Sequence, residues 1–394
     1  MNIEDVYPPS EPVQELYCDS CRGHLDLAFT DFREDVSGVD ISIRGLPVLR
    51  CEACQKDHLP KGSRFGISEQ YKIATERGLS AIRVARRRME QDFGFTKIAF
   101  LYEADDYYYI PGLYRGFDIG FLTPVFFNRK ALLKYDADPA YKVKFASTTY
   151  GTIETEDSLI AFGINKHGKL VMWLGDIAKL PESEQYYLRS ENVPSDHSIG
   201  SEFYEGQIDC VYTPPSLENN LFALRSAFLE ACAERFGLKI AQLDTEVYDF
   251  ALSFIGPVID TDKTRTHVAD TLNKIYIESF DNGALGAIMT KAGSDPKGLG
   301  SLKRLQAVLV SIAPEEDIPR MLSPFYVLYD LRVAYSHLTP AATAAAKLKL
   351  VTDRLALEEG AGLMAIYGGL MAAMTDAFVR LTEIVKTSTL ASDD

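Results

Sequence analysis

Two closely spaced cysteine pairs constrain the N-terminal part of this chain more than any other feature. They are Cys18-Asp-Ser-Cys21 and Cys51-Glu-Ala-Cys54. Two intervening residues let both thiolates of a pair turn toward one metal ion, and two such turns complete the tetrahedral sulfur shell that Zn²⁺ prefers. Disulfides or a redox-active pair are the alternatives, but a redox pair requires a flanking βαβ pattern that is absent here. The sequence therefore predicts one structural Zn²⁺ ion bound by all four thiolates.

The segment between the pairs has the features of a zinc ribbon. Residues 41–50 read as a β-hairpin that turns at Gly45 and Pro47 and delivers the second cysteine pair to the metal. Residues 17–23 and 45–54 are similar to the zinc ribbons fused to certain bacterial antitoxins and regulators. This resemblance covers only the segment 14–60, and it implies a fold without an activity. The nearby His24 and His58 are expected to contact the cysteines or solvent rather than the metal.

Length and composition set broad limits on the protein class. With 394 residues, of which 46% are hydrophobic and 25% charged, the chain has room for two or three globular domains. No run approaches the roughly 20 apolar residues of a membrane span, and the acidic, proline-broken N-terminus does not resemble a signal peptide. Only Cys210 and Cys232 lie outside the two pairs, as suits a reducing compartment. We therefore expect a cytoplasmic protein without a membrane partner.

The charge of the chain is uneven. A net charge of −15 excludes a broadly basic nucleic-acid-binding surface. Between Lys61 and Asp92, however, eight Lys or Arg stand against four Asp or Glu. We interpret residues 61–94 as a basic linker helix that begins near Ser68 and turns its arginines outward. A solvated helix without a ligand is the alternative. The candidate nucleic-acid-binding residues are Arg83, Arg86, Arg87 and Arg88.

Residues 95–216 change to short apolar and aromatic runs separated by turn residues, which is the pattern of strands. Asn165–Gly168 has the composition of a hairpin turn. We therefore expect a mainly antiparallel β middle domain. The predicted strands are residues 97–102, 107–110, 159–162 and 170–174.

Part of this middle segment, between residues 162 and 204, looks like a block that recurs in uncharacterised bacterial proteins. The resemblance implies no function. If the block holds a site, its polar side chains are the candidates, although caps and buried hydrogen bonds at a domain joint explain them equally. These residues are Glu184, Arg189, Asn192 and Glu202.

The remainder of the chain, residues 217–390, has helical periodicity throughout. Short connections between the helices imply antiparallel neighbours, and hence an up-and-down bundle. The predicted helices are residues 217–236, 266–279, 301–312, 321–338, 341–356 and 362–387.

Within this bundle, Arg332 and His337 have four residues between them, late on a predicted helix. The pair resembles the R-x(4–6)-H motif of HEPN domains, small helical bundles that dimerise and cleave RNA without a metal. The resemblance implies that Arg332 holds the scissile phosphate and that His337 acts as the general acid and base. Arginine offers a permanently charged planar fork, and histidine titrates near neutrality, so both suit these roles.

Two observations leave a structural role for the pair open. Residues five apart on a straight helix point about 140° away from each other, so either the helix relaxes near Ser336 or a second subunit brings its own pair into the site. The residue after the arginine is Val333, whereas catalytic members of the family commonly have a polar residue there. Helix capping or ion pairing is therefore the alternative to catalysis.

Taken together, the patterns predict an α+β multidomain protein with four parts: a zinc ribbon (14–60), a basic linker helix (61–94), a β-rich middle domain (95–216) and a HEPN-like all-α bundle (217–390). No phosphate-binding loop, dinucleotide fingerprint or hydrolase elbow is present. The leading hypothesis is a metal-independent endoribonuclease that acts as a toxin or antiviral defence effector. It would cleave RNA as a homodimer or higher homo-oligomer, under the control of a regulatory protein or a phage-derived trigger. The alternative is a non-catalytic zinc-ribbon regulator that binds nucleic acid or protein and dimerises through its bundle.

Overall fold

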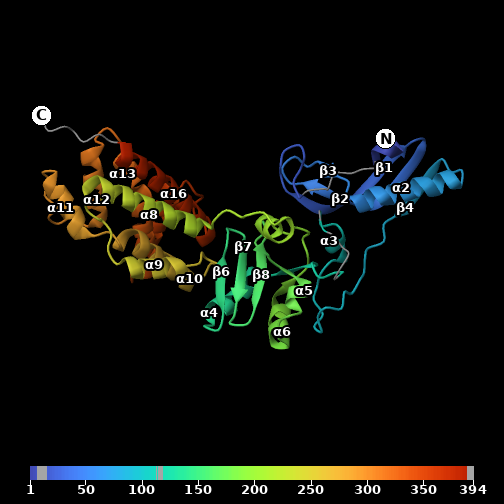
Figure 1. Ribbon diagram of the computed structural model, residues 1–394, viewed down its shortest axis with the longest axis horizontal. Coiled ribbons are helices and arrows are strands. Elements are labelled where there is room, and N and C mark those ends of the chain that lie inside the picture. The colour runs from blue at the N-terminus through green and yellow to red at the C-terminus, as the bar shows by residue number, and fades with distance from the viewer. Residues whose placement is uncertain (7–15, 112, 114–118, 388–394) are drawn as a thin grey trace. The chain divides into compact units, whose positions relative to one another are not determined.

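The computed structural model describes residues 1–6, 16–111, 113 and 119–387 (Figure 1). The chain forms two compact units, Met1–Pro214 and Pro215–Asp394. The boundary lies next to the predicted start of the helical segment at residue 217. We call them the N-terminal unit and the helical unit. No helix of the described ranges combines the length and the apolar composition of a membrane span.

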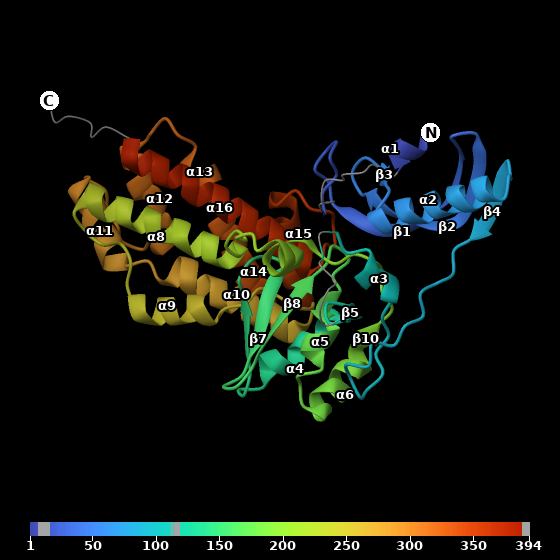
Figure 2. The same cartoon turned by 45° about the vertical axis from the view of Figure 1, so that its right-hand side comes forward.

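The N-terminal unit begins with a lobe (residues 1–6 and 16–85) built on a long twisted hairpin, over which one helix packs (Figure 2). Ile41 and Ile43 of the hairpin pack against Ile67 and Ala74 of that helix in a buried cluster. The strands are β1 (Leu25–Val36), β2 (Val39–Cys51), β3 (Asp57–His58) and β4 (Ala81–Ala85), and the helices are α1 (Ile3–Val6) and α2 (Lys61–Glu76).

The predicted hairpin within residues 41–50 is wrong, because these residues form a single strand. β2 pairs antiparallel with β1 along its whole length, and the turn lies at Ser37 and Gly38, whose φ angles are 48° and 89°. Gly45 instead lies beside a register shift in the pairing, where its amide donates to the Asp31 carboxylate. Its φ of 70° accommodates an irregularity inside a strand, which looks like a turn in the sequence.

The predicted linker helix within 61–94 is correct only in part. α2 begins at Lys61, so Ser68 lies inside it and does not cap it, and it ends at Glu76. Residues 81–85 form β4, which pairs in parallel with residues 40–44 of β2. Ile82 and Val84 alternate with exposed residues and pack against the lobe's core. Burial therefore repeats every two residues, as in a strand, rather than every 3.6 residues, as in a helix. Residues 86–103 form neither helix nor strand.

The rest of the N-terminal unit contains a six-stranded sheet in the order β10-β5-β9-β8-β7-β6, with every pair antiparallel, as predicted. Trp173 stacks on Phe203 in its core, with ring centroids 4.6 Å apart. The strands are β5 (Pro124–Phe127), β6 (Lys142–Phe145), β7 (Tyr150–Glu154), β8 (Leu159–Ile164), β9 (Leu170–Trp173) and β10 (Asn192–Val193). The helical segments are α3 (Ala104–Tyr108), η1 (Arg129–Ala131), α4 (Leu132–Ala137), α5 (Leu174–Ile177), α6 (Glu182–Glu191), α7 (Ser201–Tyr204) and η2 (Glu205–Asp209).

Two of the predicted strands are absent. Residues 107 and 108 belong to α3 and residues 109 and 110 follow its end, whereas residues 97–102 run without a partner strand. In the latter segment the Asn192 side chain takes the place of a neighbouring strand: it accepts from the Leu101 amide at 2.5 Å and donates to the Leu101 carbonyl at 3.1 Å. A side chain 91 residues away therefore satisfies this extended backbone.

The helical unit consists of helices joined by short connections, with α16 packed along α8 (Figures 1 and 2). Phe378 of α16 is fully buried at its centre, where its ring lies 5.2 Å from that of Phe325 and 5.7 Å from that of Phe228. The elements are α8 (Leu217–Phe236), α9 (Asp244–Ser253), α10 (Asp262–Asn273), η3 (Lys274–Glu278), α11 (Asn282–Lys291), α12 (Ser301–Ile312), α13 (Ile318–Met321), α14 (Ser323–Ser336), α15 (Ala341–Arg354) and α16 (Leu363–Thr387).

Candidate metal centre and neighbouring clusters

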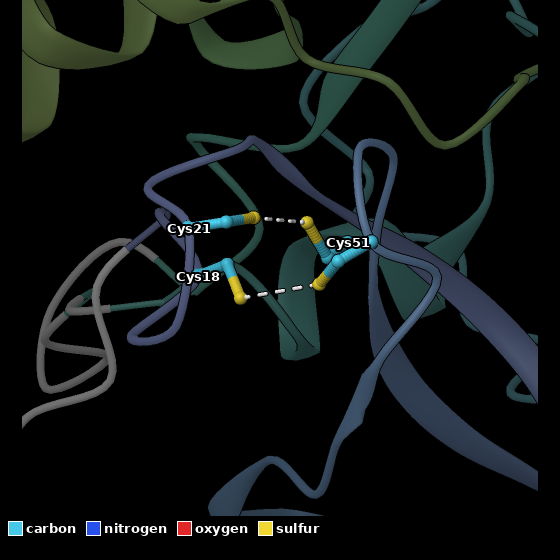
Figure 3. Close-up of side chains that lie close together, drawn as sticks. Cys18, Cys21 and Cys51 are labelled. Carbon is cyan, nitrogen blue, oxygen red and sulfur yellow. Dashed lines mark hydrogen bonds between the residues drawn. The ribbon is translucent and has the colours of Figure 1, made fainter.

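The four predicted cysteines converge at one end of the hairpin (Figure 3). All four Sγ atoms lie within 4.8 Å of one another. The Sγ–Sγ distance is 3.8 Å between Cys18 and Cys54 and 3.5 Å between Cys21 and Cys51. A tetrahedral Zn²⁺ ion with Zn–S bonds of about 2.3 Å has sulfur–sulfur edges of about 3.8 Å. The cluster therefore has the dimensions of a Cys₄ metal site.

The two cysteine loops share one backbone design. In each loop the first cysteine donates its amide to the carbonyl five residues later, at 2.8 Å for Cys18 and 2.9 Å for Cys51. Its carbonyl accepts from the amide four residues later, which belongs to Arg22 in one loop and Gln55 in the other. Arg22 and Gln55 have φ angles of 61° and 60°. This repeated conformation turns both thiols of each loop toward the same point.

Hydrogen bonds from backbone amides lower the pKa values of two of these thiols. Amide hydrogen bonds, the largest from Cys54, lower the pKa of Cys51 to about 7. Burial raises the pKa of Cys18, but the amides of Ser20 and Cys21 outweigh that effect and the net shift is downward. Thiolates are the metal-binding form of cysteine, so these amides favour metal binding at neutral pH.

Cys21 behaves differently from those two thiols. The Gly23 amide lowers the pKa of Cys21, yet the neighbouring thiols of Cys51 and Cys54 raise it to about 12. Such crowding of ionisable sulfurs is the arrangement that a bound dication relieves. Gly23 also leaves the space that the cluster occupies, because a Cβ atom at this position would lie 2.9 Å from the Cys51 Sγ.

His58 lies against the cluster without replacing a cysteine. Its Nε2 is 3.3 Å from the Cys18 Sγ, whereas Cys54 completes the four-sulfur set. His24 packs its ring against Tyr17, with ring centroids 4.7 Å apart. Four protein thiolates leave no open position for a substrate, which is the arrangement of a structural rather than a catalytic zinc site. Zinc bound here would hold the base of the hairpin closed.

The structure divides the four candidate arginines into two groups. Arg86 forms an ion pair with the buried Asp105, and its guanidinium lies 4.3 Å from the Phe29 ring centroid. Arg88 pairs with Glu103. These two side chains therefore join the N-terminal lobe to the segment around α3. Arg83 and Arg87 are exposed, on β4 and just after it.

Arg332 and His337 occupy different surroundings within the helical unit. The Arg332 guanidinium contacts two carboxylates, Glu278 Oε1 at 2.7 Å and Asp270 Oδ1 at 3.4 Å. His337 is exposed and is the residue that ends α14, where its φ and ψ have become extended. No contact between Arg332 and His337 is found in the described part of a single chain. Their joint site remains a prediction about an assembly.

Three of the four polar candidates in the central block make internal contacts. Glu184 accepts from the Lys134 ammonium at 2.6 Å. The Asn192 side chain forms two hydrogen bonds with the backbone of Leu101. Glu202 accepts from the hydroxyl of Ser147 at 3.0 Å. These contacts favour the alternative in which the block's polar residues hold segments together.

The structure contains a buried cluster of an aspartate, a serine and a histidine that the sequence did not predict. Asp106 of α3 is only 4% exposed, and its carboxylate accepts from His197 Nδ1 at 2.5 Å and from the Ser195 hydroxyl at 2.6 Å. His197 has a φ of 64°, and its ring meets the Phe29 ring edge-on at 5.4 Å. The partners are about 90 residues apart in sequence, so no local pattern could have joined them.

This cluster predicts a pH-dependent stability of the N-terminal unit. The hydrogen bond to Asp106 raises the pKa of His197 above its usual 6.5, with Glu103 and Asp105 adding to the effect, while burial raises the pKa of Asp106. Both groups favour the folded state more in their protonated forms. The stabilisation from His197 is therefore complete below pH 6.5 and is lost as the pH rises through its raised pKa.

We expect His197→Gln to reduce this pH dependence and to cost about 1–3 kcal/mol at pH 6, because it weakens a hydrogen bond to a buried carboxylate. Urea unfolding of both proteins between pH 6 and 9 measures the difference. His167→Gln is the matched control, since His167 binds the carboxylate of Asp196 but is exposed. A pH profile that is the same for wild type and His197→Gln would contradict the assignment.

No known protein family, curated protein or solved structure shows significant similarity to this chain. The resemblances to zinc ribbons and to HEPN domains therefore rest on the motifs alone.

Proposed function

We propose that this protein is a non-catalytic binding protein whose N-terminal lobe is organised by structural zinc and contacts nucleic acid. The observation that carries the proposal is the closed four-cysteine cluster at the base of a hairpin with exposed arginines on its outer face. A closed metal site shapes a surface rather than performing chemistry. The surface it supports here is the part of the sheet that faces away from α2.

The strand register aligns these arginines. Arg33 of β1 lies opposite Ser42 of β2, which in turn lies opposite Arg83 of β4, so the three form one row across the sheet. Arg44 lies two residues further along β2 and therefore on the same face. Arg44 and Arg83 are exposed, as is Arg87 just beyond β4. Guanidinium groups spaced along a sheet face suit the phosphates of a nucleic acid.

The test is the salt dependence of binding to labelled single-stranded RNA and duplex DNA. Arg44→Glu, Arg83→Glu and Arg87→Glu combined should weaken binding at least tenfold and flatten the slope of log K against log salt, by about 0.7–0.9 for each phosphate that is no longer neutralised. The matched control reverses three exposed charges of α2 and its C-terminal cap, with the same change in net charge. These are Lys61, Lys72 and Arg77. Equal weakening in both triple variants would contradict the proposed surface.

A second candidate function is the HEPN-type, metal-independent endoribonuclease, acting as a toxin or defence effector. It is favoured by one observation: Arg332 lies in the last turns of α14 and the exposed His337 directly follows that helix, within a compact unit built of helices. In this candidate a homodimer brings two such pairs together over the RNA. The zinc-bound lobe would then position RNA or receive a regulatory protein or phage-derived trigger.

We expect His337→Ala to lower RNA cleavage by about 10²–10⁴-fold if His337 is the general acid and base. Cleavage of tRNA and mRNA is measured without added Mg²⁺, with the zinc content of each sample verified, and the oligomeric state is followed by sedimentation. His267→Ala, an exposed histidine of α10, is the matched control. Both Arg332→Ala and Arg332→Lys are measured. Arg332→Ala removes the cation that pairs with Asp270 and Glu278, whereas Arg332→Lys retains a positive charge beside them. Wild type and variants that are equally inert or equally active would exclude this candidate.

A further inference from the structure

A pocket in the helical unit lies between α8 and the beginning of α9 and has a volume of about 540 Å³. Its walls combine apolar side chains, including Phe222 and Leu229, with the hydroxyls of Ser226 and Tyr248. None of the candidate sites described above uses it. One of its lining residues, Arg225, has a charge that the surrounding protein does not balance.

Arg225 is 5% exposed, yet no carboxylate in the described part of the chain pairs with it. Its guanidinium donates one hydrogen bond, from Nη2 to the Ser279 hydroxyl at 2.8 Å, and lies 5.6 Å from the Phe222 ring centroid. Its Nε is buried without a partner. Burial lowers the pKa of Arg225 to about 10, so the group is still charged at neutral pH. A buried charge without a counter-ion is costly, and a bound anion would remove that cost.

The same pocket contains the N-terminus of α9. The N-cap position of this ten-residue helix is Leu243, which has no side-chain acceptor for the free amides of the first turn. These amides and the helix dipole attract anions. Of the first-turn acidic residues, Asp244 lines the pocket and forms an exposed ion pair with Lys239, and Glu246 is exposed. Two independent sources of positive potential therefore meet at one cavity.

We propose that this pocket binds a small organic anion, whose phosphate or carboxylate group contacts Arg225 and the N-terminus of α9. The apolar part of the ligand packs between Phe222 and Leu229. The proposal does not depend on either function proposed above. The competing explanation is that Arg225 only anchors the end of η3 through Ser279, where the negative end of that helical segment stabilises the guanidinium.

Calorimetric titration of the full-length protein with phenyl phosphate, benzoate and inorganic phosphate tests the proposal, with benzyl alcohol as the uncharged control. The comparison of the two aromatic anions identifies the acidic group. Ser226→Glu places a carboxylate at an exposed position of the pocket and should abolish binding, whereas Ser226→Gln should retain it. Arg225→Met should weaken binding at least tenfold. A hydrogen bond to a charged group typically contributes a free energy that corresponds to about a tenfold change in affinity or more.

The thermal stability of the same variants separates the two explanations. An anion-binding Arg225 predicts that Arg225→Met unfolds at the same temperature as wild type or higher without ligand, and that phenyl phosphate raises the melting temperature of wild type alone. Arg304→Gln, a substitution elsewhere in the helical unit, is the control and should retain binding. Absence of binding by all three anions to wild type, or equal binding by Arg225→Met or Ser226→Glu, would overturn the proposal.

Discussion

Removal of zinc is expected to unfold the metal end of the N-terminal lobe, residues 16–27 and 47–58, while the helical unit stays folded. Among the residues that the structure describes, the buried cluster at this end consists of Cys18, Cys51 and two leucines, Leu25 and Leu49. Two leucines bury too little apolar surface to hold two loops closed, since a fully buried leucine contributes about 1.5–3 kcal/mol. Structural zinc in small domains contributes roughly 10–16 kcal/mol, so its loss is the larger effect.

Hydrogen exchange of the zinc-loaded protein, of the chelated protein and of Cys51→Ser measures this effect. The amides of Cys18 and Cys51, which close the two loops, should lose protection first. Metal analysis should find one zinc per chain, and none in Cys51→Ser. Cys210→Ser is the control, because Cys210 is exposed and lies outside the cluster. If the metal-free protein retains full amide protection in both cysteine loops, the cysteines do not form a structural zinc site.

Phe378→Ala is expected to destabilise the helical unit by about 3–5 kcal/mol. The side chain is fully buried among Phe228, Tyr276 and Phe325, so its removal leaves a cavity lined by rings that cannot all move inward. Val379→Ala on the same helix is the control, because Val379 is 49% exposed and should cost less than about 0.5 kcal/mol.

The two substitutions together test whether the units fold independently. Calorimetry of Phe378→Ala should show one transition moved to lower temperature and the transition of the N-terminal unit unchanged. Cys51→Ser should lower the temperature of the N-terminal unit's transition and leave the transition of the helical unit unchanged. If either substitution shifts both transitions equally, the chain unfolds as one cooperative structure and the division at Pro214 has no thermodynamic meaning.

Features with a local signal were predicted well from the sequence. The two cysteine pairs identified the four-cysteine cluster because each pair lies within a single turn of chain. The helix α8 was predicted with its observed bounds, since Ser216 caps it at one end and Gly237 ends it at the other with a φ of 65°. Both caps act within a few residues of the helix and are therefore visible in the sequence.

Features that depend on distant partners were missed. Residues 81–85 are too short to show whether their period is two or 3.6, and their pairing with β2 decides the outcome. Asp106 has no local signal because its partners, Ser195 and His197, lie about 90 residues later. The charge of an arginine likewise does not reveal whether a carboxylate will cover it, as happens for Arg86 and not for Arg225.

The parallel pairing of β4 also bears on how the lobe responds to mechanical load. The chain leaves the lobe at Ala85, from an edge strand held by β2 on one side only, so tension along the chain would unzip β4 one residue at a time. Arg86 and Arg88 follow immediately and are fastened to Asp105 and Glu103. These two ion pairs bridge the segment between them, so tension applied beyond Asp105 passes through the pairs to Arg86 and reaches β4 directly, and the bridged segment carries load only after both pairs break.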